Sequence, residues 1–261
     1  MTNRQGEIIW YELMTRDADK AAAFYGAVVG WQVAAPPPGG PDYRMIVAPD
    51  GNAGGMLQLD DAMLAAGASP TWLAYFGVDD VDASVAGIVA EGGKVLVPAW
   101  DAAGVGRIAM LTDPQGIPFY VMRGATEGAT STVYQRRGLG HVGWNELLAP
   151  DAEGALGFYH RQFGLTRMGG MPMGEMGEYS FIGHEGGEPI GAIMRAPPGA
   201  KPGWGFYFRI DDVDQAKGLV EAAGGTVVME PMDVPGGERV LQAVDPDGAV
   251  FGLVSGAEVQ A

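Results

Sequence analysis

The sequence has 261 residues, with 32 Asp and Glu against 16 Lys and Arg, a formal net charge of -16, and no cysteine. This charge repels phosphate backbones and anionic lipid, and the lack of cysteine excludes disulfides, thiolate metal sites and cysteine nucleophiles. No apolar run reaches the roughly 18 residues of a membrane span, and the first residues lack the pattern of a secretion signal. We therefore expect a cytoplasmic protein that binds neither nucleic acid nor membrane.

The first predicted elements are a strand and a helix. The stretch EIIWYELM, residues 7–14, is rich in β-branched and aromatic side chains, which predicts a strand. Asp17 then stands where a helix N-cap belongs. Apolar residues follow at three- and four-residue steps as far as Gly30, which is placed to end the helix.

The rest of the first half continues this alternation of strands and helices. After two strand-like stretches, 42–48 and 53–59, the pattern restarts with a strand, a helix and three more strands: WLAYFGV (72–78), DDVDASVAGIVAEGG (79–93), VLVPAW (95–100), GRIAMLT (106–112) and PFYVM (118–122). The sequence DPQG, residues 113–116, predicts a tight turn before the last strand. Each half of the chain is thus expected to hold two βαβββ modules.

The second half of the sequence repeats the first. DADKAAAFY at 17–25 matches DAEGALGFY at 151–159, and the later stretches 75–95 and 107–121 match 207–227 and 239–254. Self-similarity over half a chain indicates a duplicated domain. We expect one domain at 1–125 and another at 138–261, joined by a small polar linker at 126–137.

These motifs resemble those of the vicinal oxygen chelate superfamily, which includes glyoxalase I, extradiol dioxygenases, fosfomycin-resistance enzymes and bleomycin-binding proteins. The shared features are D-x-x-x-A-x-x-F-Y after the opening strand, D-D-V-D before the second helix, and D-P-x-G at 113–116 and 245–248. They occur twice in the same order and cover nearly the whole chain. The resemblance implies an α+β fold of tandem glyoxalase-like domains, in which two βαβββ modules form a curved half-barrel sheet.

The resemblance also implies a divalent metal held by His, Gln or Glu. The corresponding positions hold Trp10 and Trp144, Leu73 and Gly205, Tyr120 and Gly252, and Gln58 and Met194. A catalytic zinc or iron site needs about three N, O or S ligands, which these residues do not supply. We therefore expect no metal cofactor.

The three histidines leave one alternative open. His160 lies on a predicted helix and is expected at the surface. His141 and His184 both belong to the second half, and a metal site that they would form near Glu146 remains possible from the sequence.

Strand alternation predicts which side chains line the pocket. Side chains two residues apart face the same side of a strand, so Glu12 and Glu146 share a side with Trp10 and Trp144. The same counting gives further candidate ligand-binding residues: Leu73, Tyr75, Tyr120, Tyr207 and Arg209. An aromatic pocket with one carboxylate suits a small aromatic or polar organic molecule.

A purely structural interpretation stands beside this one. The aromatic side chains can fill the core of each sheet, and a buried carboxylate without a partner is costly. Arg107 and Arg239 recur at matching positions, so Glu12 and Glu146 could each form an architectural ion pair with an arginine.

Three functional hypotheses follow. The first is a metal-independent protein that binds a small molecule through Trp, Tyr and Glu side chains. The second is an enzyme of the lyase, isomerase, hydroxylase or dioxygenase type, which uses Glu12 or Glu146 as general base or an unrecognised divalent metal site. In the third, only one half binds and the other is a scaffold. The expected partner is a small-molecule ligand or substrate, and the chain is expected as a monomer or homodimer.

Overall fold

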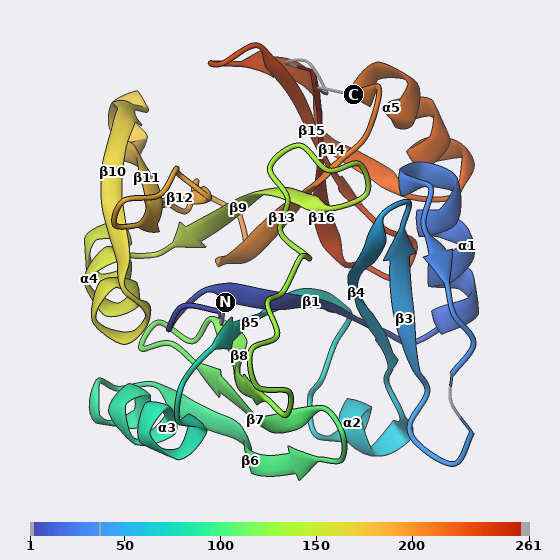
Figure 1. Ribbon diagram of the computed structural model, residues 1–261. Coiled ribbons are helices and arrows are strands. Elements are labelled where there is room, and N and C mark those ends of the chain that lie inside the picture. The colour runs from blue at the N-terminus through green and yellow to red at the C-terminus, as the bar shows by residue number, and fades with distance from the viewer. Residues whose placement is uncertain (1–2, 37, 257–261) are drawn as a thin grey trace. The chain divides into compact units, whose positions relative to one another are not determined.

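The computed structural model describes residues 3–36 and 38–256 (Figure 1). The first half contains β1 (Ile8–Thr15), α1 (Ala18–Val29), β2 (Gln32–Val33), β3 (Tyr43–Ala48), β4 (Gly51–Gln58), α2 (Asp61–Ala65), β5 (Thr71–Gly77), α3 (Val81–Ala90), β6 (Lys94–Ala102), β7 (Gly106–Thr112) and β8 (Pro118–Gly124). The second half contains β9 (Val142–Ala149), α4 (Ala152–Phe163), β10 (Leu165–Pro172), the 3-10 turn η1 (Gly174–Met176), β11 (Glu178–His184), β12 (Gly191–Arg195), β13 (Gly203–Arg209), α5 (Val213–Ala222), β14 (Thr226–Val234), β15 (Glu238–Val244) and β16 (Val250–Gly256).

The strands form two eight-stranded mixed sheets, neither of which is closed. Their orders are β2-β3-β4-β1-β5-β8-β7-β6 and β10-β11-β12-β9-β13-β16-β15-β14, so the second sheet repeats the first strand for strand. This confirms the α+β fold of two tandem glyoxalase-like domains. The sequence did not predict β2, α2 or η1, because elements of two to five residues are too short to show a period.

The helix ends follow the local chemistry predicted from the sequence. The Asp17 carboxylate accepts a hydrogen bond from the Lys20 backbone N–H at 3.0 Å, and α1 ends at Gly30 with φ 85°. In α4 the Asp151 carboxylate accepts from the Gly154 N–H, and Gly164 ends the helix with φ 67°. Both helices therefore carry a side-chain N-cap and a left-handed C-terminal glycine. None of the described helices is both long enough and apolar enough to cross a membrane.

The chain divides into two compact units that do not follow the sequence halves. Unit 1 consists of Met1–Ile9, Leu73–Ser131 and Asn145–Trp204, and unit 2 of Trp10–Trp72, Thr132–Trp144 and Gly205–Ala261. Each unit therefore combines one module of the first repeat with one module of the second.

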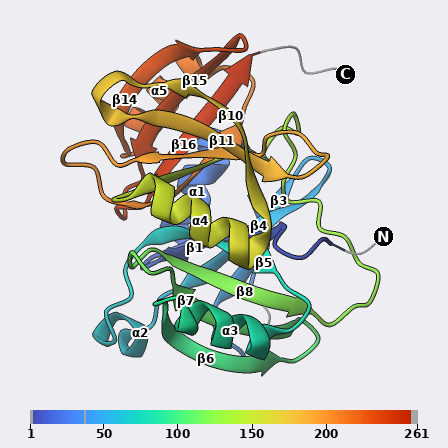
Figure 2. The ribbon, with the colours of Figure 1, turned by 90° about the vertical axis from the view of Figure 1, so that its left-hand side faces the viewer.

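In unit 1, residues from the two repeats share one aromatic core. Helices α3 and α4 contact each other (Figure 2), and the rings of Phe76 and Phe163 stack with centroids 4.2 Å apart. The Tyr159 hydroxyl on α4 donates to the Asp113 carboxylate at 3.3 Å and accepts from the Trp204 indole N–H at 3.0 Å. Asp113 belongs to the D-P-Q-G turn of the first repeat. The F-Y and D-P-x-G motifs therefore join two repeats within one unit.

Unit 2 has the same arrangement, but here the first repeat supplies the tyrosine and the second repeat supplies the aspartate. Helices α1 and α5 lie side by side (Figure 1). The Tyr25 hydroxyl on α1 donates to the Asp245 carboxylate at 3.1 Å and accepts from the Trp72 indole N–H at 2.9 Å. Burial raises the pKa of Asp245, as it does for Asp113 in unit 1. These motifs of the sequence resemblance are therefore part of the core of each unit.

Candidate ligand site

A buried carboxylate in unit 2 shares a hydrogen-bond network with two half-buried aromatic side chains. The indole N–H of Trp10 donates to the Tyr43 hydroxyl at 2.7 Å, and this hydroxyl is also hydrogen-bonded to the Glu12 carboxylate. Glu12 is only 1% exposed. Burial and then the charge of Glu12 raise the pKa of Tyr43 well above its usual value, so the phenol stays protonated and donates to the carboxylate. Trp10 and Glu12 therefore share one face of β1, as strand alternation predicted.

A glycine allows the tyrosine to reach the carboxylate. Gly55 on β4 lies directly opposite Glu12 in the parallel pair of β1 and β4. A Cβ atom on Gly55 would lie 2.0 Å from the Tyr43 hydroxyl oxygen. Because this space is empty of side chain, the phenol from β3 extends across β4 to Glu12. The strand order β3-β4-β1 thus brings Tyr43 to Glu12.

The second repeat contains the same tyrosine–glutamate pair, in unit 1. The Tyr179 hydroxyl on β11 donates to the Glu146 carboxylate on β9 at 2.8 Å. Sequence reasoning selected both glutamates and missed both tyrosines. A signal was present: DYRMIVA and EYSFIGH each begin with an acidic residue followed by tyrosine, so extending the alignment of the repeats would have found the pair.

Three predicted residues of the first repeat lie in unit 1. Tyr75 and Tyr120 are opposite each other in the β5–β8 pair, and their rings stack with centroids 4.2 Å apart. The edge of the Trp100 ring approaches Tyr120, and Trp100 is 37% exposed, which leaves aromatic surface accessible. Leu73 is buried.

The matching positions of the second repeat differ. Tyr207 lies opposite Gly252, where a Cβ atom would be 2.3 Å from the tyrosine ring. The ring therefore occupies the place that a second aromatic side chain would need. Gln242 donates a hydrogen bond to the Tyr207 hydroxyl. In place of the Tyr75–Tyr120 stack, the second repeat has the single ring of Tyr207 next to Gly252, with its hydroxyl hydrogen-bonded to the Gln242 amide.

Arg209 belongs to a buried network in unit 2. It is 1% exposed, and its guanidinium donates to the backbone oxygens of Arg136 at 2.8 Å and Gly256 at 3.0 Å, and to Glu238. The second carboxylate oxygen of Glu238 accepts from the Arg136 side chain at 2.9 Å. Arg136 in turn lies over the ring of Trp144. Sequence reasoning missed Glu238 and Arg136, which lie far from Arg209 in the chain.

The architectural pairing of Glu12 and Glu146 with arginines is wrong. Arg107 forms ion pairs with Asp82 at 2.9 Å and with Asp101 at 3.0 Å. Arg239 forms the equivalent pairs with two aspartates of its own repeat, Asp214 and Asp233. The two arginines recur because each repeat uses the same surface ion pairs.

The positions where the resemblance implies metal ligands do not fit a metal ion. Gln58 is the one oxygen donor of amide type among them, and its Oε1 accepts from the Ala18 backbone N–H at 3.0 Å, at the start of α1. Tyr120 is the other oxygen donor, and its buried ring stacks on Tyr75. Indole, leucine, methionine and glycine at the remaining positions do not complete a set of about three ligands. Across residues 3–36 and 38–256, no three His, Asp or Glu side chains are grouped to hold a metal.

The three histidines lie in three different environments. His160 is exposed on α4, as predicted. His141 is fully buried in unit 2, with Nε2 2.6 Å from an Asp50 oxygen and Nδ1 3.2 Å from the Val133 carbonyl. Burial lowers the pKa of His184 in unit 1. His141 therefore has an aspartate as its partner and belongs to another unit than His184 and Glu146.

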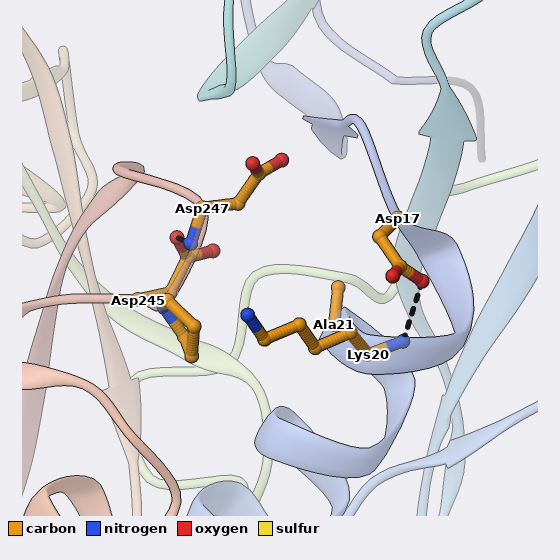
Figure 3. A pocket seen from close by; sticks show the side chains of 6 residues that line it. Asp17, Lys20, Ala21, Asp245 and Asp247 are labelled. Atoms are coloured by element: carbon orange, nitrogen blue, oxygen red, sulfur yellow. Dashed lines mark hydrogen bonds between the residues drawn. The ribbon is translucent and has the colours of Figure 1, made fainter.

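Two surface depressions lie at other residues. A crevice of about 10 Å³ in unit 2 is lined by Asp17, Lys20, Ala21, Asp245, Pro246 and Asp247 (Figure 3). Figure 3 shows the Lys20 side chain extending toward the turn that carries Asp245 and Asp247. An open depression of about 360 Å³ in unit 1 is lined by Glu153, Leu156, Gly157, His160, Leu165, Thr166 and Arg167. The first has room for about one water molecule, and neither contains a candidate site residue.

Comparisons with known proteins agree with this geometry. The family model described as Glyoxalase/Bleomycin resistance protein/Dioxygenase superfamily matches residues 7–121 and 138–253. "Putative glyoxylase CFP32" of Mycobacterium bovis is 34% identical over 259 residues, which cover 98% of this chain and 97% of that protein. "Anthracycline biosynthesis protein DauV" of Streptomyces sp. is 31% identical over 275 residues, 95% of this chain and 93% of that protein.

Solved structures share the fold at low identity. The Mn(II)-bound glyoxalase from Novosphingobium aromaticivorans has a TM-score of 0.64 and 19% identity, covering 98% of this chain and 83% of that chain. An extradiol ring-cleaving dioxygenase from B. fuscum has a TM-score of 0.67 and 16% identity, covering 97% and 73%. With both repeats matched by one family model, the chain belongs to the Glyoxalase/Bleomycin resistance protein/Dioxygenase superfamily.

Proposed function

We propose that the protein binds a small planar organic molecule at the group of Trp10, Tyr43 and Glu12, without a divalent metal. The observation that carries the proposal is the buried Glu12 carboxylate, which is hydrogen-bonded to half-buried Tyr43, whose hydroxyl also accepts from the half-buried Trp10 indole. Indole and phenol offer flat surfaces for stacking, and the carboxylate accepts a hydrogen bond or pairs with a cation. The residues at the family's metal positions do not fit a metal, and this supports binding without a divalent metal.

The chemistry of the group favours a ligand that carries a donor. Tyr43 already supplies a hydroxyl proton to Glu12, and its raised pKa keeps that proton in place. A ligand with a hydroxyl, amine or protonated nitrogen at the edge of an aromatic ring complements the carboxylate. The relative named for anthracycline biosynthesis supports a planar, ring-fused class.

Titration with an anthracycline, followed by quenching of tryptophan emission and by calorimetry in a chelating buffer, tests this function. Wild type is expected to bind, and Glu12→Gln is expected to bind about 10- to 100-fold more weakly, because a hydrogen bond to a charged group is worth about 1.5–3 kcal/mol. Glu127→Gln removes the same charge at an exposed position and is the control. Equal affinity of Glu12→Gln and wild type, or a stoichiometric metal whose removal abolishes binding, would refute the proposal.

A second candidate function is catalysis with Glu146 as general base. The observation in its favour is the 2.8 Å hydrogen bond from Tyr179, which orients the carboxylate of Glu146. A positioned carboxylate contributes about 10²- to 10⁴-fold to a proton transfer. The relative named as a glyoxylase supports an enzyme.

Assays with an α-ketoaldehyde and a catechol as trial substrates test catalysis. If either is turned over, Glu146→Gln is expected to lower kcat by at least about 100-fold. Tyr179→Phe should keep part of the activity and shift its pH profile, since the carboxylate loses its donor. Full turnover by Glu146→Gln would remove this residue from the mechanism.

A further inference from the structure

The chain covers the Trp144 ring with one of its own cations. In unit 2 the guanidinium carbon of Arg136 lies 4.5 Å from the centroid of this ring. Trp144 also packs, together with Met229 and Val234, against an apolar cluster of Tyr207, Val240 and Val254. An indole ring on an apolar base attracts cations through its quadrupole. Arg136 therefore occupies a place that is suited to a planar cation.

Arg136 is held through both its backbone and its side chain. Its carbonyl oxygen accepts from the fully buried Arg209, whereas its side chain is 37% exposed. The guanidinium is held by the indole face and by one hydrogen bond to Glu238. A substitution that removes the side chain therefore leaves the backbone contact to Arg209 in place.

We propose that Trp144 and Glu238 form a binding site for a planar organic cation, and that Arg136 is its built-in competitor. The indole face and the carboxylate are the two partners that such a cation requires, and both now serve the guanidinium. Arg209 keeps Glu238 in position from the buried side. The inference rests on the proposed function for the planar class of ligand and adds the charge of the ligand and a residue that limits its access.

The first repeat offers a different environment for the aligned tryptophan. Trp10 and Trp144 are 134 residues apart, and by this offset Arg136 aligns with Thr2, which carries no charge. The indole N–H of Trp10 donates to Tyr43. The two repeats are thus expected to differ in ligand preference, with the second selecting for positive charge.

Binding of a matched pair of probes tests the inference. N-methylacridinium is a planar cation, and acridine at pH 8 is its neutral counterpart. Arg136→Ala and Arg136→Gln are expected to bind N-methylacridinium about 5- to 30-fold more tightly than wild type, the range that a cation–π contact represents. Arg137→Ala, at the exposed neighbouring position, removes the same charge and should leave affinity unchanged. Adding Trp144→Phe or Glu238→Gln to Arg136→Ala should reverse most of the gain.

A measurement without ligand accompanies the titration. Acrylamide quenching of the Trp144 emission, taken as the difference between proteins with and without Trp144→Phe, is expected to rise in Arg136→Ala. Unchanged quenching, no gain in affinity for the cation, or an equal gain for neutral acridine would each overturn the inference. If wild type fails to bind an anthracycline while Arg136→Ala gains the cation, the proposed function at Trp10 fails and the site at Trp144 stands.

Discussion

Replacing Arg209 by leucine is expected to lower the free energy of unfolding by about 3–5 kcal/mol, because it leaves a partner carboxylate without its buried cation. Arg209 is 1% exposed and holds Glu238 together with the backbone oxygens of Arg136 and Gly256. Leucine fills part of the space and satisfies none of these acceptors. Urea denaturation followed by tryptophan emission measures the loss.

Two further variants separate the ion pair from the packing. In the double variant Arg209→Leu with Glu238→Leu, the carboxylate that lost its buried partner is gone, so part of the stability should return. Arg239→Leu removes an arginine from surface ion pairs with Asp214 and Asp233 and should have a much smaller effect. A loss for Arg209→Leu no larger than that for Arg239→Leu would contradict the buried network as a source of stability.

Replacing Tyr25 or Tyr159 by phenylalanine is expected to cost about 2–4 kcal/mol in either case. Each hydroxyl serves two buried partners, so its removal takes the acceptor from an indole N–H and the donor from one carboxylate oxygen. Tyr25 acts in unit 2 and Tyr159 in unit 1, and each joins modules from different repeats. The two variants are thus matched controls for one another, measured by urea denaturation at pH 7. A cost below about 0.5 kcal/mol in both would show that these hydroxyls are dispensable.

The stability lost in Tyr25→Phe and Tyr159→Phe should depend on pH in a defined direction. Burial raises the pKa of Asp113 and Asp245 above the ordinary value of 3.8, so this effect favours the folded state below about pH 4 and is lost as the pH rises through the raised folded-state pKa. The tyrosine hydroxyl opposes the shift because it donates to the charged carboxylate. Loss of the hydroxyl should therefore cost more at pH 7 than at pH 3.5, where the carboxyl is largely protonated. An equal cost at both pH values would contradict this sign.

Strand alternation predicted which side chains of one strand face the same side, but not that Trp10 and Glu12 belong to unit 2 and Tyr75 and Tyr120 to unit 1. Trp10 and Glu12 were expected on one face of a strand, and both are hydrogen-bonded to the same tyrosine. Tyr75 and Tyr120 were expected to line the same surface, and their rings stack. Tyr43 was missed because it reaches Glu12 only across Gly55, which depends on β3, β4 and β1 being neighbours.

The sequence by itself determined the longer helices and strands, because caps, glycine ends and side-chain alternation act over a few residues. The repeated motifs determined the duplication and the family resemblance. Only the tertiary structure decided the partners of Arg209, Tyr25 and Tyr159, each of which reaches far along the chain or into the other repeat. The physical reason is that a hydrogen bond or ion pair between distant residues depends on strand order and on how the modules pack, and neither is encoded in local periodicity.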